Sequence, residues 1–207
     1  MIWGLLELYE ATFKVDYLKA ALDLNKLFLQ YFWDAERGGF YFTSADASEL
    51  PVRKKEIYDG ATPSGNSVAA LNLIRLHRIT GDPEFEKQAD LLGRAFSASV
   101  DQFPSAYTQL LVALEFSMGP SHEIVITGRA GAADTARLLN ELRKPFLPNK
   151  VVLFRPANSE SSEIAGIAPY TRDQKELDGK ATAYVCANFS CEMPTSDPAR
   201  MMELLNR

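Results

Sequence analysis

Hydrophobic residues recur with a helical period over the first half of the chain and change to short apolar runs in the second half. Five helices are predicted in the first half, at residues 1–13, 16–32, 66–80, 83–98 and 105–116. Asp82 is the expected N-cap of the fourth helix, with Pro83 at its first position. Between the second and third helices, residues 33–43 predict a short β-ribbon with its bend at Gly38-Gly39.

The first and second helices repeat in the third and fourth. Hydrophobic positions match at an offset of 68 residues, from Leu5 with Leu73 to Phe28 with Phe96. The third and fifth helices are apolar nearly all round, whereas the second and fourth are amphipathic. An apolar helix must be buried on every side, so we expect an inner layer and an outer layer of helices. This pattern is typical of helical hairpins in a partial (α/α) toroid or a solenoid.

After Gly119-Pro120 the pattern changes to strand, helix and strand, at residues 123–127, 133–144 and 150–154. That order predicts a βαβ unit in a small, mainly parallel sheet. A further strand is expected at 183–186 and a closing helix at 198–205, while residues 155–180 show no clear structure. We therefore predict a mainly α fold with a carboxyl-terminal α/β part. The expected division is a helical-hairpin segment at 1–119 and a small α/β subdomain at 120–207.

Composition excludes several function classes. The chain has 22 Lys and Arg against 27 Asp and Glu, a net charge of -5, which argues against nucleic acid and anionic membranes as partners. No apolar run reaches the roughly 20 residues of a membrane span, and the first residues lack the basic start of a signal peptide. We expect a cytoplasmic protein.

The cysteines and histidines do not predict a metal centre. Cys186 and Cys191 form a C-x4-C pair, and His77 and His122 are the two histidines of the chain. This set cannot complete a four-ligand zinc site, and residues 128–131 lack the pattern of a phosphate loop. We therefore expect no metal and no cofactor. In a reducing cytoplasm the cysteines are expected to be free thiols, with a redox role as the alternative.

The polar loop 54–67 carries the candidate chemistry. Gly60, Pro63 and Gly65 impose an irregular backbone, and the loop leads directly into the apolar third helix. A loop of this kind can deliver carboxylates to the mouth of a pocket. The alternative is a solvated acidic loop with a capped helix start, in which Ser64, Asn66 or Ser67 is the cap.

A family resemblance rests on three segments: residues 56–67, which read EIYDGATPSGNS, residues 33–43, and residues 184–191, which read YVCANFSC. Together they resemble the carboxyl-terminal portion of the thioredoxin-domain-containing YyaL and spermatogenesis-associated protein 20 family. The resemblance implies an amino-terminal thioredoxin-like domain followed by an (α/α)6 toroid of the six-hairpin glycosidase kind. This chain has no C-x-x-C and about two and a half hairpins, so we expect a fragment of a longer protein.

The resemblance implies a carbohydrate-directed pocket, glycosidase-like or epimerase-like, that is not catalytically complete in this chain. Candidate catalytic groups are Asp59 and Glu56, and candidate substrate-binding residues are Tyr58, Asn66, Trp33 and Tyr41. Glycoside hydrolysis needs two carboxyl groups roughly 5 to 9.5 Å apart, and Asp34 and Glu36 are further candidates for the pair. Each carboxylate could instead be a solvated or capping group, and Trp33 and Tyr41 could be hairpin core. An epimerase would need a histidine base, for which His77 and His122 are poorly placed in the sequence.

Three further expectations follow. Asp59→Asn should remove sugar binding and leave stability nearly unchanged. The open toroid edge, on the first, second and fifth helices, should be covered by self-association, most simply in a symmetric dimer. The competing function is a non-catalytic scaffold or a redox-linked interaction module.

Overall fold

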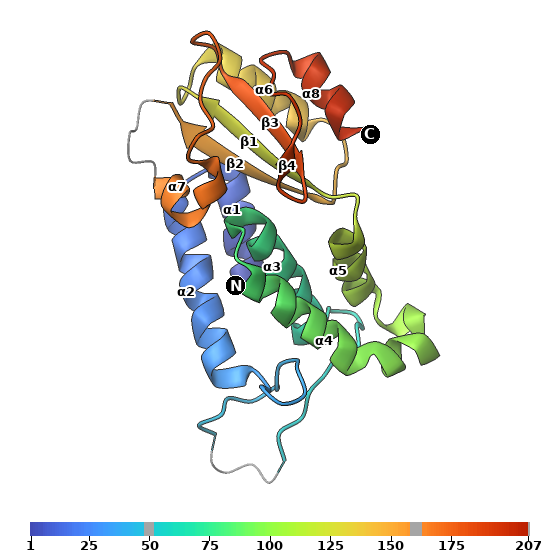
Figure 1. The fold of residues 1–207 in the computed structure, drawn as a ribbon. Coiled ribbons are helices and arrows are strands. Elements are labelled where there is room, and N and C mark those ends of the chain that lie inside the picture. Colours follow the sequence, from blue (N-terminus) through green and yellow to red (C-terminus); the bar gives the residue numbers. More distant parts are fainter. Residues whose placement is uncertain (48–51, 158–162, 207) are drawn as a thin grey trace. The chain divides into compact units, whose positions relative to one another are not determined.

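The computed structural model describes residues 1–47, 52–157 and 163–206 and divides into two compact units (Figure 1). The first unit consists of Met1–His77 and Asp82–Met118. The second consists of Gly119–Arg207 together with Arg78–Gly81, the end of the third helix and the residue after it. The described residues contain eight α-helices and one four-stranded sheet, which confirms the predicted combination of helices and a smaller sheet.

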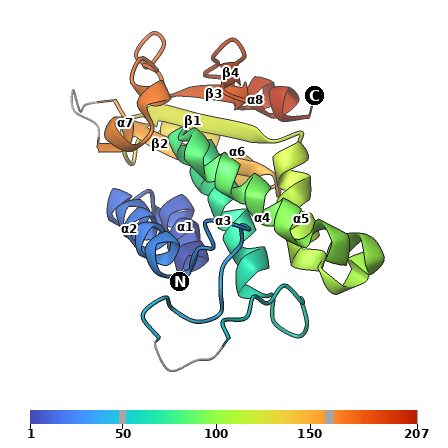
Figure 2. The ribbon, with the colours of Figure 1, turned by 60° about the horizontal axis from the view of Figure 1, so that its bottom comes forward.

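The first unit is helical, as predicted. Its helices are α1 (Ile2–Thr12), α2 (Val15–Phe32), α3 (Gly65–Thr80, up to His77), α4 (Pro83–Gln102) and α5 (Thr108–Met118), with a 3-10 turn at Pro104–Ala106. α1 and α2 pack as an antiparallel pair, which both ribbon views make plain (Figures 1 and 2). The expected cap of α4 is confirmed, since the Asp82 side chain accepts a hydrogen bond from the Glu84 amide.

α3 lies in the core of the first unit, and nearly all of its residues are buried. Within this unit α3 carries the buried guanidinium of Arg75, which forms ion pairs with the carboxylates of Glu7 and Glu10 on α1. The pair Glu7–Arg75 joins positions that the 68-residue repeat makes equivalent (75 − 7 = 68). A buried charge of this kind is tolerated because it is paired and hydrogen-bonded.

One expectation for the first unit is wrong: α5 is not buried all round, because Val112 is 48% exposed. The ribbon at 33–43 is present in a short form, with one antiparallel bridge between Trp33 and Phe40. Backbone hydrogen bonds from Asp34 to the Gly39 carbonyl oxygen and from Tyr41 to the Phe32 carbonyl oxygen flank this bridge, and the side-chain hydrogen bonds described below add to them.

The second unit is a four-stranded sheet with helices against it. Its strands are β1 (His122–Gly128), β2 (Lys150–Pro156), β3 (Thr182–Ala187) and β4 (Ser190–Cys191), in the order β2-β1-β3-β4. The other elements are α6 (Ala133–Arg143), α7 (Glu163–Ile167), a 3-10 turn at Pro169–Thr171 and α8 (Pro198–Leu205). α6 packs on β1 and against α8, and the two helices lie behind the sheet in Figure 1.

The βαβ unit is confirmed, but the prediction of a mainly parallel sheet is wrong. β1 and β2 are parallel, whereas β3 runs antiparallel to β1 and to β4. Between β2 and β3 the described residues form α7 and the 3-10 turn, and β3 runs in the opposite direction to β2. These two elements correct the expectation of no clear structure at 155–180, of which residues 158–162 lie outside the described residues.

The expectation of free thiols is also wrong, because Cys186 and Cys191 form a disulfide. The two residues are direct partners in the β3–β4 hairpin, whose two-residue turn brings them opposite one another. No helix in the described parts of the chain is long and apolar enough to cross a bilayer.

Candidate functional site

A pocket of about 310 Å³ opens in the first unit, where the loop before α3 meets the end of α2. Its wall is largely aromatic, with a polar side supplied by the loop. The lining residues are Phe28, Phe32, Phe40, Tyr41, Phe42, Glu56, Tyr58, Thr62, Pro63, Ser64, Gly65 and Asn66. Segments distant in sequence therefore meet here: the end of α2, the turn that follows it, and the loop 54–67.

Four of the six predicted site residues line this pocket: Tyr41, Glu56, Tyr58 and Asn66. Asp59 and Trp33 are not among its described lining residues. Tyr58 is 67% exposed and Glu56 is also exposed, so both can reach a ligand without breaking the core. Among the described lining residues Glu56 is the one carboxylate, so the predicted pair of carboxylates does not converge in this pocket.

Asn66 fixes the shape of the pocket. Its buried amide donates to the carbonyl oxygens of Phe40, at 2.9 Å, and Glu56, at 2.8 Å, and its Oδ1 accepts from the Phe40 amide at 2.7 Å. The side chain thus pairs with both backbone groups of Phe40 and adds to the backbone hydrogen bonds of the turn. Gly39 has a φ of +78°, and a Cβ there would lie 3.0 Å from the Phe96 ring. Asn66 therefore supports the pocket wall through these three hydrogen bonds.

Asp59 ties together the starts of α3 and α5. Its Oδ1 accepts from the Ser64 amide at 2.8 Å, and its Oδ2 accepts from the Ser67 hydroxyl at 3.0 Å. Oδ2 also accepts from the amides of Gln109 and Leu110, at 2.9 and 3.1 Å, in the first turn of α5. A carboxylate placed at free helix amides is a stabilising cap. The geometry therefore gives Asp59 a structural role, and the expectation that Asp59→Asn leaves stability unchanged is at odds with it.

Behind Tyr41 lies a buried polar cluster. Asp34 accepts from the Tyr41 hydroxyl at 2.7 Å, pairs with the Lys55 ammonium at 2.6 Å, and accepts from the amides of Glu36 and Arg37. Burial by itself raises the pKa of Asp34, but the hydrogen bonds from Lys55, Tyr41 and the two amides outweigh it and hold that pKa well below its usual range.

The same cluster fixes the Tyr41 ring. Its hydrogen bond to Asp34, followed by burial, raises the pKa of Tyr41, so the hydroxyl stays a donor to the carboxylate. The Arg53 guanidinium lies 4.0 Å from the ring centroid and donates to the carbonyl oxygens of Thr43 and Tyr31. Tyr41 is therefore a rigid wall of the pocket. Asp34, a further candidate of the carboxylate pair, is neutralised by Lys55, and Glu36 is exposed outside the lining.

Trp33 belongs to the hairpin core. Its ring packs edge-on to Phe40, with the centroids 4.9 Å apart, and Phe40 stacks on Phe28 at 4.1 Å. This is the alternative that the sequence left open for Trp33. The pocket wall formed by Phe28, Phe32 and Phe40 was missed, although the four-residue spacing of Phe28 and Phe32 on an amphipathic helix marks a shared face.

The histidines lie outside the lining of this pocket. His77 is buried, with Nδ1 2.9 Å from the Asp82 carbonyl oxygen, which suits a structural role. In the second unit, burial lowers the pKa of His122. No group of three His, Cys, Asp or Glu side chains that could hold a metal ion occurs within residues 1–47, 52–157 and 163–206.

The whole chain aligns with known proteins from animals. It is 36% identical over 207 residues to spermatogenesis-associated protein 20 of Homo sapiens, of which it covers 26%. It is 34% identical over 208 residues to the protein of the same name from Mus musculus, of which it also covers 26%. The chain is homologous to the carboxyl-terminal part of this family.

The resemblance inferred from residues 56–67 and 184–191 is thereby confirmed. An uncharacterized protein of Caenorhabditis elegans is 28% identical over 207 residues, and the chain covers 28% of it. No family model matches the chain. The chain spans about a quarter of the length of the two spermatogenesis-associated protein 20 relatives. The pocket therefore lies in the region over which the chain aligns with them.

Proposed function

We propose that the first unit forms part of a carbohydrate-binding pocket, in which Tyr58 and Tyr41 contact the sugar and Glu56 is the candidate catalytic carboxylate. The observation that carries the proposal is the convergence of Tyr41, Glu56, Tyr58 and Asn66 on one aromatic pocket of about 310 Å³. That volume lies at the lower end of ligand sites in proteins. The C–H faces of a sugar ring pack on aromatic rings, while its hydroxyls take polar partners.

The proposal includes the partial toroid. The α1–α2 and α3–α4 hairpins, with their matching hydrophobic positions, would be two of the six hairpins of an (α/α)6 ring. The pocket lies beside the start of α3, the most buried helix of the first unit, where an inner helix of such a ring begins. The remaining hairpins, and any second carboxylate, would lie in the part of the longer relatives that this chain does not cover.

The 207-residue chain is therefore proposed to bind without turnover. A two-carboxylate hydrolysis needs a partner for Glu56, and Asp59 is committed to the amides of Ser64, Gln109 and Leu110. The epimerase-like form of the proposal lacks support from the pocket, because its described lining contains no histidine. A second candidate function, a redox-linked interaction module, is favoured by the Cys186–Cys191 disulfide.

The test measures saccharide binding to the 207-residue chain through the NMR chemical-shift changes that appear when mono- and disaccharides are added. Tyr58→Ala should weaken binding at least about tenfold, because the exposed ring is the proposed stacking platform and its loss removes roughly 1.4 kcal/mol or more. Tyr17→Ala is the matched control, since Tyr17 is a half-buried tyrosine on α2 of the same unit and is not among the described lining residues of this pocket or of the neighbouring apolar groove. Equal effects of the two substitutions, or shifts that map away from the pocket, would reject the proposal.

A further inference from the structure

The Cys186–Cys191 disulfide closes the short hairpin of the second unit. β4 is two residues long, so two residue pairs, Cys186 with Cys191 and Ala187 with Ser190, make up the whole ladder between β3 and β4. Cys186 is 1% exposed, whereas Cys191 lies in an exposed strand. The bond therefore joins a buried residue to one in an exposed strand.

The turn of this hairpin has an unfavourable backbone. Asn188 and Phe189 both have positive φ, 51° and 61°, a region that is costly for a bulky side chain such as Phe. Such a conformation persists only where its surroundings hold it. Here the Asn188 Oδ1 accepts from Arg78 Nη1 at 2.7 Å, the Phe189 amide donates to Glu123 Oε2 at 3.0 Å, and the Phe189 ring packs edge-on to Tyr170 at 5.3 Å.

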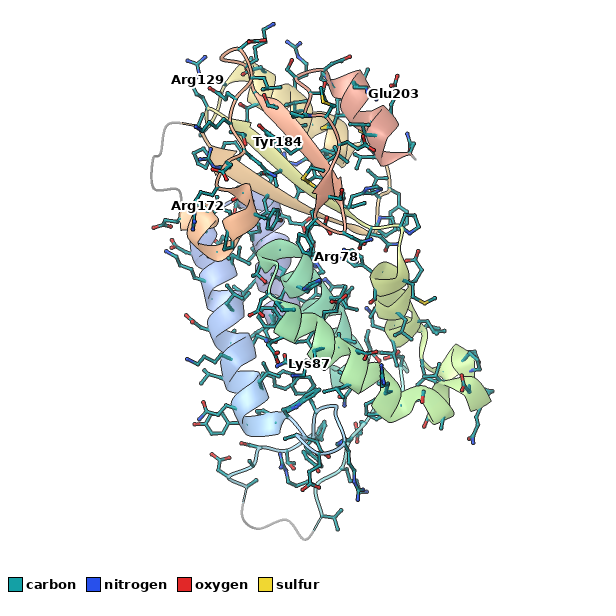
Figure 3. All side chains as sticks on the ribbon, in the orientation of Figure 1. Arg78, Lys87, Arg129, Arg172, Tyr184 and Glu203 are labelled. Carbon is teal, nitrogen blue, oxygen red and sulfur yellow. A yellow bond between two sulfur atoms is a disulfide. The ribbon has the colours of Figure 1, made fainter. Side chains whose placement is uncertain are left out.

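The turn in return contributes hydrogen bonds to a buried ion pair, although Arg78 Nε remains unpaired among the described residues. Arg78, labelled in Figure 3, belongs to the second unit and lies 2.9 Å from Glu123 Oε1 through its Nη1. The Glu123 side chain is 0% exposed and that of Arg78 is 6% exposed. A buried pair is tolerated only when further hydrogen bonds satisfy both partners. Asn188 supplies an acceptor to the guanidinium, and the Phe189 amide supplies a donor to the carboxylate.

The disulfide lies directly beside this pair. Glu123 on β1 is the register partner of Cys186 on β3, and opposite residues of an antiparallel pair share one face of the sheet. The hairpin crosslink, its strained turn and the Arg78–Glu123 pair therefore form one connected group. A change in the crosslink must act on the turn and, through it, on the ion pair.

We propose that Cys186–Cys191 is a reversible dithiol–disulfide site, and that its oxidation state sets how firmly the turn Asn188-Phe189 holds the Arg78–Glu123 pair. The reaction partner is a dithiol. One thiolate of that dithiol attacks Cys191 Sγ and forms a mixed disulfide with it, while the Cys186–Cys191 bond breaks and Cys186 leaves as a thiolate that takes a proton from water. The second thiolate of the dithiol then attacks the partner's own sulfur in the mixed disulfide, and Cys191 leaves as a thiolate that also takes a proton from water. The partner ends as a disulfide, having given two electrons, and the chain ends with two thiols.

Residue placement supports this direction of attack. Cys191 is the accessible end of the bond, whereas Cys186 is buried against the sheet. Gln174 Nε2 lies 3.9 Å from Cys191 Sγ and can donate to the sulfur as negative charge develops on it in the second step. In reducing compartments, protein disulfides are usually transient and either catalytic or redox-sensing. A reversible disulfide is therefore consistent with the cytoplasmic location expected from the sequence.

Loss of the crosslink should loosen the turn by a measurable factor. Closing a loop of about six residues changes the ratio of closed to open forms by roughly 40-fold in the chain-entropy model. In the reduced protein, the Phe189 amide should therefore leave Glu123 more often and exchange with solvent roughly 40-fold faster.

The experiment follows hydrogen exchange of the Phe189 amide in the full 207-residue chain, before and after reduction with excess dithiothreitol without denaturant. Alkylation and mass spectrometry count the thiols in each state. We expect no free thiol before treatment, two after it, faster exchange at Phe189, and recovery on reoxidation. Buried amides of β1 and β2 should not respond. Cys186→Ala/Cys191→Ala should exchange fast whether or not dithiothreitol is present.

Two results would overturn the proposal. One is full alkylation of both cysteines in protein purified and kept without reductant, which would make them plain thiols. The other is complete reduction with unchanged exchange at Phe189, which would separate the crosslink from the turn. Should the double variant fail to fold, the wild-type chain with and without dithiothreitol gives the same readout. Saccharide binding by the first unit is a separate measurement, so either proposal can fail alone.

Discussion

Replacing Asp59 by Asn separates a structural carboxylate from a catalytic one. In the native chain Oδ1 accepts one hydrogen bond, from Ser64, and Oδ2 accepts three, from Ser67, Gln109 and Leu110. An Asn side chain keeps one oxygen and presents an NH2 group in place of the other. Its best orientation keeps the oxygen toward Gln109 and Leu110 and turns the NH2 group toward the Ser64 amide, where two donors face each other.

The magnitude follows from these contacts. A hydrogen bond to a charged group contributes about 1.5–3 kcal/mol, and the carboxylate at a helix start adds about 0.3–1 kcal/mol. Losing the Ser64 bond and the charge at α5 should lower the free energy of unfolding by about 2–4 kcal/mol. For a chain of this length, roughly 2–4 °C per kcal/mol gives a fall in Tm of about 4–16 °C.

The assay is urea or thermal unfolding followed by circular dichroism, with Glu56→Gln as the matched control. Glu56 stands three residues earlier and is exposed, so its substitution should change stability by less than about 0.5 kcal/mol. The reasoning would be refuted if Asp59→Asn were as stable as the native chain. Stable Asp59→Asn protein that had lost saccharide binding would instead restore Asp59 to the ligand site.

Two other predictions concern pH and association. The folded-state pKa of Asp34 is depressed, so its contribution to stability is present above the unfolded pKa of about 4 and is lost as pH falls through the folded-state pKa. When the free energy of unfolding is measured against pH, it should therefore fall less steeply below about pH 4 in Asp34→Asn than in the native chain. An equal slope in both proteins would argue against the charge cluster. The apolar groove of about 530 Å³ between α2 and α3, with Leu27 48% exposed at its rim, is where we expect a second copy to bind, so light scattering should detect a dimer that Leu27→Lys converts to monomer. A native monomer with no concentration dependence would contradict this.

Periodicity was enough to predict the helices other than α7 but could not predict strand direction. The apolar faces of α2 and α4, and the Asp82 cap, are local features, and each appears in the structure. The direction of β3 depends on how the chain runs from α7 through the 3-10 turn at Pro169–Thr171 to β3. A five-residue helix such as α7 is too short to show a period.

The disulfide was missed for a related reason. A C-x4-C pair places its cysteines opposite one another only if residues 188–189 form a two-residue hairpin turn. Asn188 favours a turn, but Phe189 is a poor residue for positive φ, so this two-residue turn could not be recognised from the residues alone. What holds Phe189 there is its contact with Glu123 and Tyr170, which lie 66 and 19 positions away (189 − 123 = 66, 189 − 170 = 19). Contacts at such separations are not visible in a single sequence.

The loop 54–67 shows why the candidate site was only partly predictable. Two carboxylates three residues apart, Glu56 and Asp59, look alike in sequence. Glu56 is exposed at the pocket, whereas Asp59 accepts from the Ser64 amide just before α3 and from amides in the first turn of α5. The difference arises from the position of α5, some 50 residues later, whose free amides need an acceptor. A catalytic carboxylate must instead keep its oxygens free for substrate. Among the described lining residues of the pocket Glu56 meets that requirement, so the hydrolysis considered under the proposed function would need Glu56 and a second carboxyl group from outside the region described here.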